Sequence, residues 1–192
     1  MEKVFERNRK IRTKMNIMEI ITDFEWFNDK GMVVTFDSHI YQQTPTMNFP
    51  NEFSYYEEEN ELAVIGVRWN YNGQPIVFTN VWYEGTLPTP NMDKVIVTTF
   101  ELGEYTTTIY NADGSVHKVV EMPRPIMPNL GRGPTRDEKP DTSKVYWCRK
   151  KVDGYTMLIR LGYYCGAWEE RYFNPETGEI GGLYSNNSYG YY

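Results

Sequence analysis

The pattern of hydrophobic and polar positions is that of β-strands joined by short turns, and it is densest in residues 62–83. Two runs of β-branched and aromatic residues flank Asn72-Gly73, a dipeptide in which both residues tolerate a positive φ. Asn-Gly between two such runs is the strongest short-range signal for a β-hairpin. A two-residue turn at this point pairs Trp69 with Ile76 and leaves mostly apolar side chains on both faces. We therefore expect a hairpin deep in a sandwich or barrel, with both faces covered.

The same pairing scheme assigns a role to the two tryptophans of this hairpin. It places Asn80 opposite Ile65, and Trp82 on the same face as Trp69. Because that face is the better packed one, Trp69 and Trp82 are predicted to lie in the core rather than on a ligand-binding surface. Asn80 is then a polar side chain on an apolar face, and it needs a hydrogen-bond partner if it is buried.

Residues 17–27 fit both the spacing of a helix and the alternation of a strand. In a strand, one face would carry Met18, Ile20, Phe24 and Trp26. The next four residues, Asn28 to Gly31, favour the strand, because Asn at the first position and Gly at the fourth suit a type I turn. We therefore predict a β-hairpin whose second strand places Val34 and Phe36 on the core side.

Residues 144–192 predict a further antiparallel unit. A two-residue turn at Asp153-Gly154 joins its first two strands. The pairings that follow from this turn are Tyr146 with Leu161, Cys148 with Ile159, and Trp147 with Arg160. The first two pairs predict a buried face, and the third predicts a cation–π contact of about 0.5–1 kcal/mol on the opposite face. Cys165 falls beyond the strand in this scheme, so two free thiols are predicted rather than a disulfide.

Together these elements predict an all-β fold, an antiparallel sandwich or partly closed barrel of about 8–10 strands with a short N-terminal helix. Residues 1–16 would form a basic N-terminal helix or arm, 17–122 a β-rich core, 123–143 a Pro/Gly-rich loop, and 144–192 C-terminal antiparallel strands packed on the same domain. The loop holds five of the eleven prolines, which excludes a central strand because proline lacks a ladder donor. It either wraps the body or crosses between two sheets.

Charge is distributed unevenly along the 192 residues. The net charge is −6, yet residues 1–14 contain six basic and two acidic residues. The acidic body disfavours nucleic acid and anionic membranes as partners. The basic arm could still bind nucleic acid, but the simpler interpretation of that arm is a solvated terminal helix. No segment resembles a signal peptide or a membrane span. We expect a cytoplasmic protein, or one assembled into a particle made in the cytoplasm.

Signatures of catalysis and metal binding are absent from the sequence. His39 and His117 are the only histidines and each stands alone, so a metal site built on clustered His and Cys is not expected. Glu169 and Glu170 are neighbours in a strand-like segment, where successive side chains point to opposite faces and cannot converge as an acid/base pair. We therefore expect no catalytic residue, no metal and no cofactor, and thus a protein that is not an enzyme.

An acidic and aromatic cluster directly before the central hairpin is the best candidate site. Its members are Tyr55, Tyr56, Glu57, Glu58, Glu59 and Glu61. Carboxylates this close to one another repel, and such clusters are most often solvated loops. As a docking patch for a basic protein, however, the same charges would speed association and select the partner. Inhibitor and immunity proteins that block basic enzymes can use this device.

The sequence as a whole favours a non-catalytic binding or assembly protein that acts through protein-protein contacts. It would be an inhibitor- or immunity-type partner, or a structural component of a larger particle such as a virion, in a homo- or hetero-oligomer. In a particle, the proline-rich loop and the tyrosine-rich tail at residues 181–192 would be the docking elements. The first alternative function is a sandwich or barrel that binds a small ligand or carbohydrate between Trp and Tyr side chains. The second alternative is a hydrolase that uses paired carboxylates.

Charge reversal tests the acidic cluster. Replacing Glu57, Glu58 and Glu59 by lysine is expected to slow association with a basic partner and to remove its salt dependence, because a charged patch steers the encounter. Stopped-flow association rates at several ionic strengths measure both effects. Unchanged rates would show that the cluster takes no part in binding.

Overall fold

The structure, a computed structural model, describes residues 20–28, 31, 33–37, 65–101, 104–126, 134, 137–140, 142–152, 155–163 and 166–187. Within these residues the chain forms twelve β-strands and one 3-10 turn, η3 (Tyr83–Gly85). The strands before the proline-rich segment are β1 (Thr22–Asn28), β2 (Val33–Thr35), β3 (Ile65–Tyr71), β4 (Gln74–Val81), β5 (Leu87–Pro88), β6 (Lys94–Glu101), β7 (Glu104–Asn111) and β8 (Val116–Val119). The strands after it are β9 (Thr142–Val152), β10 (Tyr155–Gly162), β11 (Trp168–Asn174) and β12 (Glu179–Asn187).

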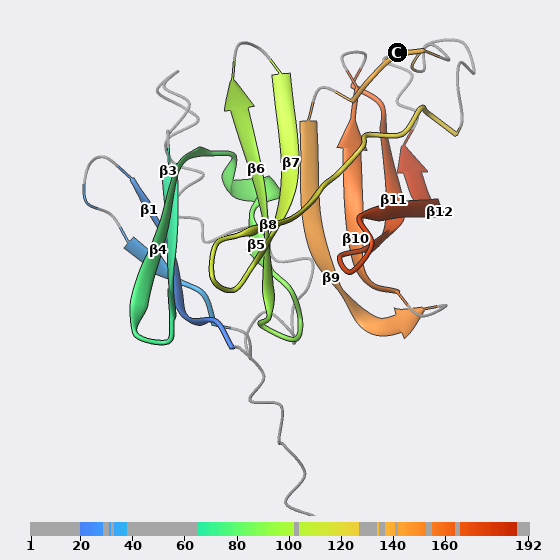
Figure 1. Cartoon of the computed structure of the whole chain (residues 1–192). Helices are drawn as coiled ribbons and strands as arrows, with labels where there is room; N and C mark the ends of the chain where they lie inside the picture. The colour runs from blue at the N-terminus through green and yellow to red at the C-terminus, as the bar shows by residue number, and fades with distance from the viewer. Residues whose placement is uncertain are drawn as a thin grey trace, which may run out of the picture.

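The strands form two antiparallel sheets that meet at β7 and β9 (Figure 1). The N-terminal sheet has the order β2-β1-β3-β4-β6-β7-β8, with β5 paired to β6, and the C-terminal sheet has the order β12-β11-β10-β9. The predicted all-β antiparallel fold is confirmed, and of the two predicted architectures the sandwich is the one observed. The N-terminal helix that the sequence predicts lies outside the described residues. No helix among those described has the length and apolar composition needed to cross a bilayer.

Both sheets contribute to one hydrophobic core. Its largest fully buried side chains include Trp69 and Phe24 from the N-terminal sheet and Phe173 from the C-terminal sheet. Trp147 of β9 reaches across the interface, where its Nε1 donates a hydrogen bond of 2.7 Å to the carbonyl oxygen of Pro88. Burial of apolar surface between the sheets is therefore what holds the C-terminal sheet in place.

Buried hydroxyl groups add a polar seam to this interface. The Oγ1 atoms of Thr98 and Thr107 lie 2.9 Å apart, and the Oγ of Ser143 in β9 lies 3.2 Å from that of Thr107. Gly85 packs so closely on this seam that a Cβ atom would lie 2.5 Å from the Thr98 hydroxyl. Because buried hydroxyls must be paired, the seam fixes where β9 lies against β6 and β7.

The β3–β4 hairpin is formed as the sequence predicts near its turn. Pairing runs in the expected order as far as Val67 opposite Phe78, and Asn72 and Gly73 have φ of 50° and 75°. Both values lie in the left-handed region that this turn requires.

At the far end of the hairpin, a β-bulge changes the pairing. Ile65 lies opposite Val81, so the prediction that it faces Asn80 is wrong. Asn80 takes a φ of 58°, a left-handed conformation that Asn adopts more readily than most residues and that lets one strand hold an extra residue. Its side chain is exposed and needs no buried partner.

The hairpin buries one face and leaves the other in solvent. On the buried face, the Trp69 ring stacks on Phe78 at a centroid distance of 5.4 Å, and its Nε1 donates to the carbonyl oxygen of Ala112 at 2.7 Å. Trp82 is half-buried and packs against the core. The expectation that both faces would be covered is wrong, since Val77 on the other face is 54% exposed.

The hairpin predicted from residues 17–36 is confirmed, because β1 pairs with β2. Its turn closes with a hydrogen bond of 3.2 Å from the Gly31 amide to the Asn28 carbonyl, and Gly31 has a φ of 80°. Val34 and Phe36 pack against the core as predicted.

The start of β1 departs from simple alternation. Ile20 is 51% exposed and Ile21 is 2% exposed, the reverse of the predicted order. The cause is Asp23, whose φ of 52° accompanies a register shift in the pairing of β1 with β3. A bulge of this kind switches which residues face the core.

The proline-rich segment leaves β8 of the N-terminal sheet and leads to β9 of the C-terminal sheet (Figure 1). Its two ends therefore join different sheets, as a crossover requires. Its first part lies against the C-terminal sheet, where Arg171 Nη2 donates to the carbonyl oxygen of Arg124 at 2.6 Å and the amide of Ile126 donates to Glu169 at 3.3 Å.

The groups that hold this crossover are a buried ion pair. The side chains of Arg171 and Glu169 are each 4% exposed, and the Tyr163 hydroxyl donates to the same carboxylate at 3.3 Å. Burial, together with the negative charge of Glu169, raises the pKa of Tyr163 well above its usual value. The phenol therefore stays protonated and remains a donor to Glu169 at neutral pH.

The predicted register between β9 and β10 is wrong. Val152 lies opposite Tyr155 as expected, but a register shift follows, and Ile159 then pairs with Val145 instead of Cys148. Trp147 consequently faces the core opposite Met157 and does not lie beside Arg160 as predicted.

The described part of the tyrosine-rich tail belongs to the C-terminal sheet. Residues 181–187 belong to β12 and pair with β11, so deleting the whole predicted tail would remove most of a strand.

The buried ion pair generates a stability prediction. Glu169→Gln leaves the Arg171 guanidinium buried without a counter-charge and is expected to lower the free energy of unfolding by about 3–5 kcal/mol. Urea unfolding followed by circular dichroism measures the change. The control is Asp137→Asn, which breaks the ion pair between Asp137 and Arg124. The side chains of Arg124 and Asp137 are 77% and 79% exposed, respectively. In Asp137→Asn we expect the free energy of unfolding to fall by about 0.5 kcal/mol or less. Equal losses in Glu169→Gln and Asp137→Asn would contradict a stabilising role for the buried ion pair.

Candidate functional site

The outward face of the C-terminal sheet carries half-buried aromatic and charged side chains. In β10, Met157, Ile159 and Leu161 are buried against the core, while Leu158 and Arg160 alternate with them and are half-buried. The same alternation in β9 and β11 follows from the two-residue period of a strand. Packing of the inner side chains therefore decides which side chains this face presents.

Cross-strand pairing arranges this face in rows that run across the strands. The first row is apolar and aromatic and consists of Tyr146, Leu158 and Tyr172. The second row is charged and consists of Lys144, Arg160, Glu170 and Ser185. In the next row, Trp168 lies opposite Gly162. We call these residues, with Glu84 at the end of the charged row, the outward face.

The charged row is tied together by direct hydrogen bonds. Arg160 donates from Nε to Oε1 of Glu170 at 2.9 Å and also donates from Nη2 to the same oxygen. The hydroxyl of Ser185 donates to Oε2 of Glu170 at 2.5 Å. At the other end of the row, Lys144 forms a salt bridge with Glu84 of η3. The row therefore holds its long side chains in fixed positions.

Aromatic rings flank Arg160 on both sides of the row. Its guanidinium carbon lies 4.3 Å from the ring centroid of Trp168 and 5.6 Å from that of Tyr146. Tyr172 in turn stacks on Tyr155 at a centroid distance of 5.3 Å. Burial raises the pKa of Tyr146 to about 12, against the opposing effect of the Arg160 charge. Its phenol is therefore neutral at physiological pH.

This composition is typical of a protein-binding surface. Trp, Tyr and Arg are the residues that most often carry binding energy at interfaces, and they do so best when held in one conformation. Arg160 meets this requirement because Glu170 and two rings fix it, while 34% of its side chain is still exposed.

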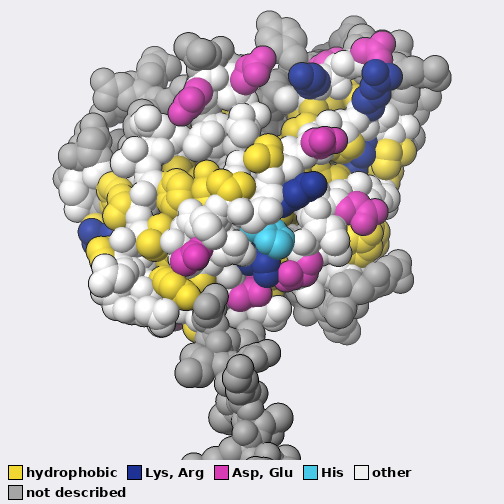
Figure 2. Space-filling view, viewed as in Figure 1, with side chains coloured by type: hydrophobic (Ala, Val, Ile, Leu, Met, Phe, Trp, Pro, Cys, Tyr) yellow, Lys and Arg dark blue, Asp and Glu magenta, His cyan; other side chains and the backbone are white. Residues whose placement is uncertain are grey.

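Two observations concern the acid/base pair and the metal site considered from the sequence. Glu169 faces inward and Glu170 outward, so these neighbours diverge as predicted. No group of three or more His, Cys, Asp or Glu side chains that could hold a metal ion occurs in the described part of the chain. Acidic and basic side chains lie beside one another on the face shown in Figure 2. Nε2 of His117 lies 2.8 Å from the carbonyl oxygen of Glu176.

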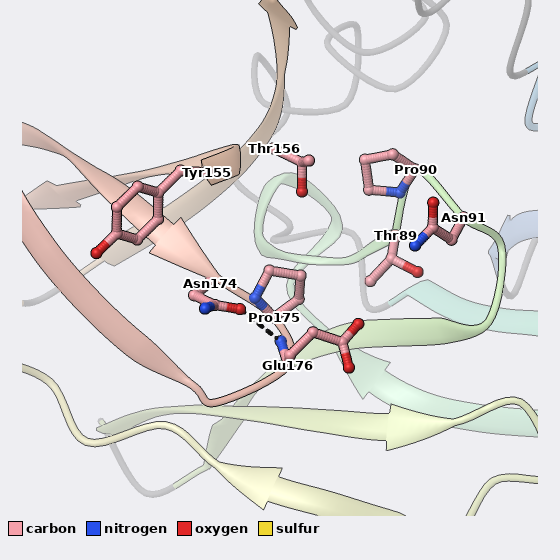
Figure 3. Close-up of a pocket in the computed structure, with 8 residues that line it drawn as sticks. All are labelled: Thr89, Pro90, Asn91, Tyr155, Thr156, Asn174, Pro175 and Glu176. Carbon is pink, nitrogen blue, oxygen red and sulfur yellow. Dashed lines mark hydrogen bonds between the residues drawn. The ribbon is translucent and has the colours of Figure 1, made fainter. Parts of the chain in front are cut away.

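A hollow between the two sheets is the candidate for the small-ligand alternative (Figure 3). Its volume is about 210 Å³, and its lining residues are Thr89, Pro90, Asn91, Tyr155, Thr156, Asn174, Pro175 and Glu176. Ligand pockets typically measure about 300–1,000 Å³ and are mostly apolar. Glu176 is moreover engaged by Lys94 at 2.8 Å, and the Tyr155 hydroxyl points away from the hollow in Figure 3. The hollow does not favour a carbohydrate site.

Three of the five tryptophans belong to the core rather than to a ligand platform. Each donates its Nε1 hydrogen to a backbone carbonyl: Trp26 to Thr86, Trp69 to Ala112 and Trp147 to Pro88. Trp82 is half-buried, and Trp168 lies on the outward face.

The acidic cluster predicted from the sequence, residues 55–61, lies outside the described residues, so its role stays a prediction. Lys144, Arg160, Glu170 and Tyr172 were not predicted as site residues, and Trp168 was predicted only as one of the five tryptophans that could bind a small ligand in the alternative function. The signal that could have found them is the alternation of aromatic and charged residues in β9, β10 and β11, read together with a correct register.

Comparisons with known proteins yield a likeness of fold. No protein-family model and no curated protein matches the chain. Among solved structures, a chain in the structure of Tne2 in complex with Tni2 is similar, with a TM-score of 0.57 and 13% sequence identity. The likeness covers 85% of this chain and 97% of that chain. The arrangement of strands is therefore one that occurs in another protein of different sequence.

Cys148 generates a reactivity prediction for this part of the sheet. Burial raises the pKa of its thiol, which lowers the thiolate fraction at any given pH. In a Cys165→Ser background, alkylation of Cys148 by iodoacetamide at pH 8 is expected to be slower than that of free cysteine, and to reach the rate in unfolded protein once urea is added. Equal rates in the folded and the unfolded protein would contradict the half-buried position.

Proposed function

We propose that the chain is a non-catalytic binding protein of the inhibitor or immunity type, and that the outward face is its docking surface. The observation that carries the proposal is Arg160, held between Trp168 and Tyr146 and fixed by Glu170. Fixing the side chains before binding lowers the entropy lost when a partner docks. Because its residues lie on strands of the C-terminal sheet, the outward face has a rigidity that an interface made of loops would lack.

The similar solved structure supports this proposal. Tne2 and Tni2 form a complex in that structure, so a chain with this arrangement of strands takes part in contact between two proteins. A likeness at 13% identity concerns the fold, and the choice of docking surface rests on the residues of this chain.

The acidic cluster at residues 55–61 enters this proposal as a second contact region. It precedes β3, and its charge would attract a basic part of the partner. The particle-component alternative relies on the tail instead, and most of that tail is already paired within β12. We therefore favour a separate protein partner over self-assembly.

Substitution of two residues on the outward face tests the proposal. Trp168→Ala and Arg160→Ala are each expected to weaken partner binding by about 2–4 kcal/mol, because both remove a central aromatic or arginine contact. The partner is first recovered by affinity purification from the source cells and identified. Its dissociation constant is then measured by calorimetry with each purified variant.

Arg68→Ala is the matched control. Arg68 also lies on the exposed face of a sheet, is ion-paired with Glu25 at 2.7 Å and lies 5.7 Å from the Phe27 ring, but belongs to the N-terminal sheet. Partner binding should be unchanged in this variant. Equal losses in Arg160→Ala and Arg68→Ala, or no loss in either face variant with the fold intact, would contradict the assignment.

A further inference from the structure

The charged row contains two cations on neighbouring strands. Lys144 of β9 lies directly opposite Arg160 of β10. Like charges at such a cross-strand position repel and destabilise the sheet. On a chain whose net charge is −6, this pair sets two positive charges side by side.

Each cation has its carboxylate on the outer side of the pair. Glu84 binds Lys144 from η3, and Glu170 binds Arg160 from β11. The order of charges along the row is therefore negative, positive, positive, negative. Glu84 contacts Lys144 and Glu170 contacts Arg160, and neither of these carboxylates bridges the two cations.

Both cations keep donors that the described residues do not use. Arg160 binds Glu170 through Nε and Nη2, which leaves its Nη1 hydrogens without an acceptor among the described residues. Lys144 has three ammonium hydrogens and a salt bridge to Glu84. Their side chains are 34% and 32% exposed, so an anion can reach them.

We propose that this cation pair receives a carboxylate side chain, Asp or Glu, of the protein partner. This inference rests on the proposed function and adds the chemistry of the partner at the centre of the docking surface. A carboxylate placed between Lys144 and Arg160 relieves their repulsion and accepts the free donors. The rings of Trp168 and Tyr146 beside it contact the aliphatic part of the acidic residue.

A second copy of the chain is a poorer occupant than a different protein. When the charged row meets its own symmetry mate in register, cations oppose cations and carboxylates oppose carboxylates. Like-charge contacts of this kind disfavour an interface. A partner with acidic residues at the centre has the complementary order.

The first experiment uses hexa-L-glutamate with blocked ends as the probe. Binding at about 20 mM salt, where charges are weakly screened, is followed by NMR shifts of the tryptophan indole N–H signals. Lys144→Gln and Arg160→Gln are each expected to weaken binding about three- to fivefold. Arg160→Lys keeps the positive charge but loses the planar guanidinium, so its affinity for hexaglutamate should lie between those of Arg160→Gln and wild type. Arg68→Gln is the control and should bind as wild type.

Three results of this experiment would overturn the inference. They are an absence of binding, equal weakening in Arg68→Gln and Arg160→Gln, and tighter binding of a hexadeoxynucleotide than of hexaglutamate at the same face. The last result would assign the cation pair to phosphate instead of carboxylate.

The second experiment uses the purified partner and separates this inference from the proposed function. If Trp168→Ala loses the partner and the two glutamine variants also bind it several-fold more weakly, both stand. If Trp168→Ala loses the partner but Lys144→Gln and Arg160→Gln bind as wild type, the proposed function stands and the acidic contact is refuted. If no variant of the outward face affects the partner, the proposed function itself falls.

Discussion

Burial of one face of the C-terminal sheet is the constraint on which the rest of the structure depends. Glu169 and Arg171 sit on that inner face as a buried ion pair, in line with apolar residues such as Ile159. Because a strand alternates strictly, fixing these side chains inward forces Arg160 and Glu170 outward. A slip of one residue would place the ion pair in solvent and the outward charges in the core. The energetics of the interior therefore determine the chemistry of the exterior.

The sequence predicts those parts of the fold that local chemistry decides. Asn72-Gly73 and Gly31 mark turns in which a positive φ is required, and both hairpins form there. What the sequence does not reveal are the bulges near Asp23 and Asn80, since packing against distant strands decides where an extra residue is accommodated. The shift between Tyr155 and Met157 is a third such case, and it moved Trp147 from the predicted outer face into the core.

The candidate site escapes sequence reasoning for a related reason. Glu84, Lys144, Arg160, Glu170 and Ser185 form one row in space, although they come from five different elements of the chain. The acidic cluster at residues 55–61 is conspicuous because its members are adjacent in sequence. A row across a sheet becomes visible when the pairing of every strand is known, and one shifted register hides it.

The outward face also differs from what stability alone would favour. Two cations on adjacent strands repel, whereas a threonine, valine or oppositely charged pair at the same positions would stabilise the sheet. Residues that oppose stability in this way are expected where binding requires them. Glu84 and Glu170 each bind one of these two cations, Lys144 and Arg160, from the outer side of the pair. A partner carboxylate placed between Lys144 and Arg160 would add a negative charge where two neighbouring strands set like charges opposite each other, and that contact would contribute to the affinity.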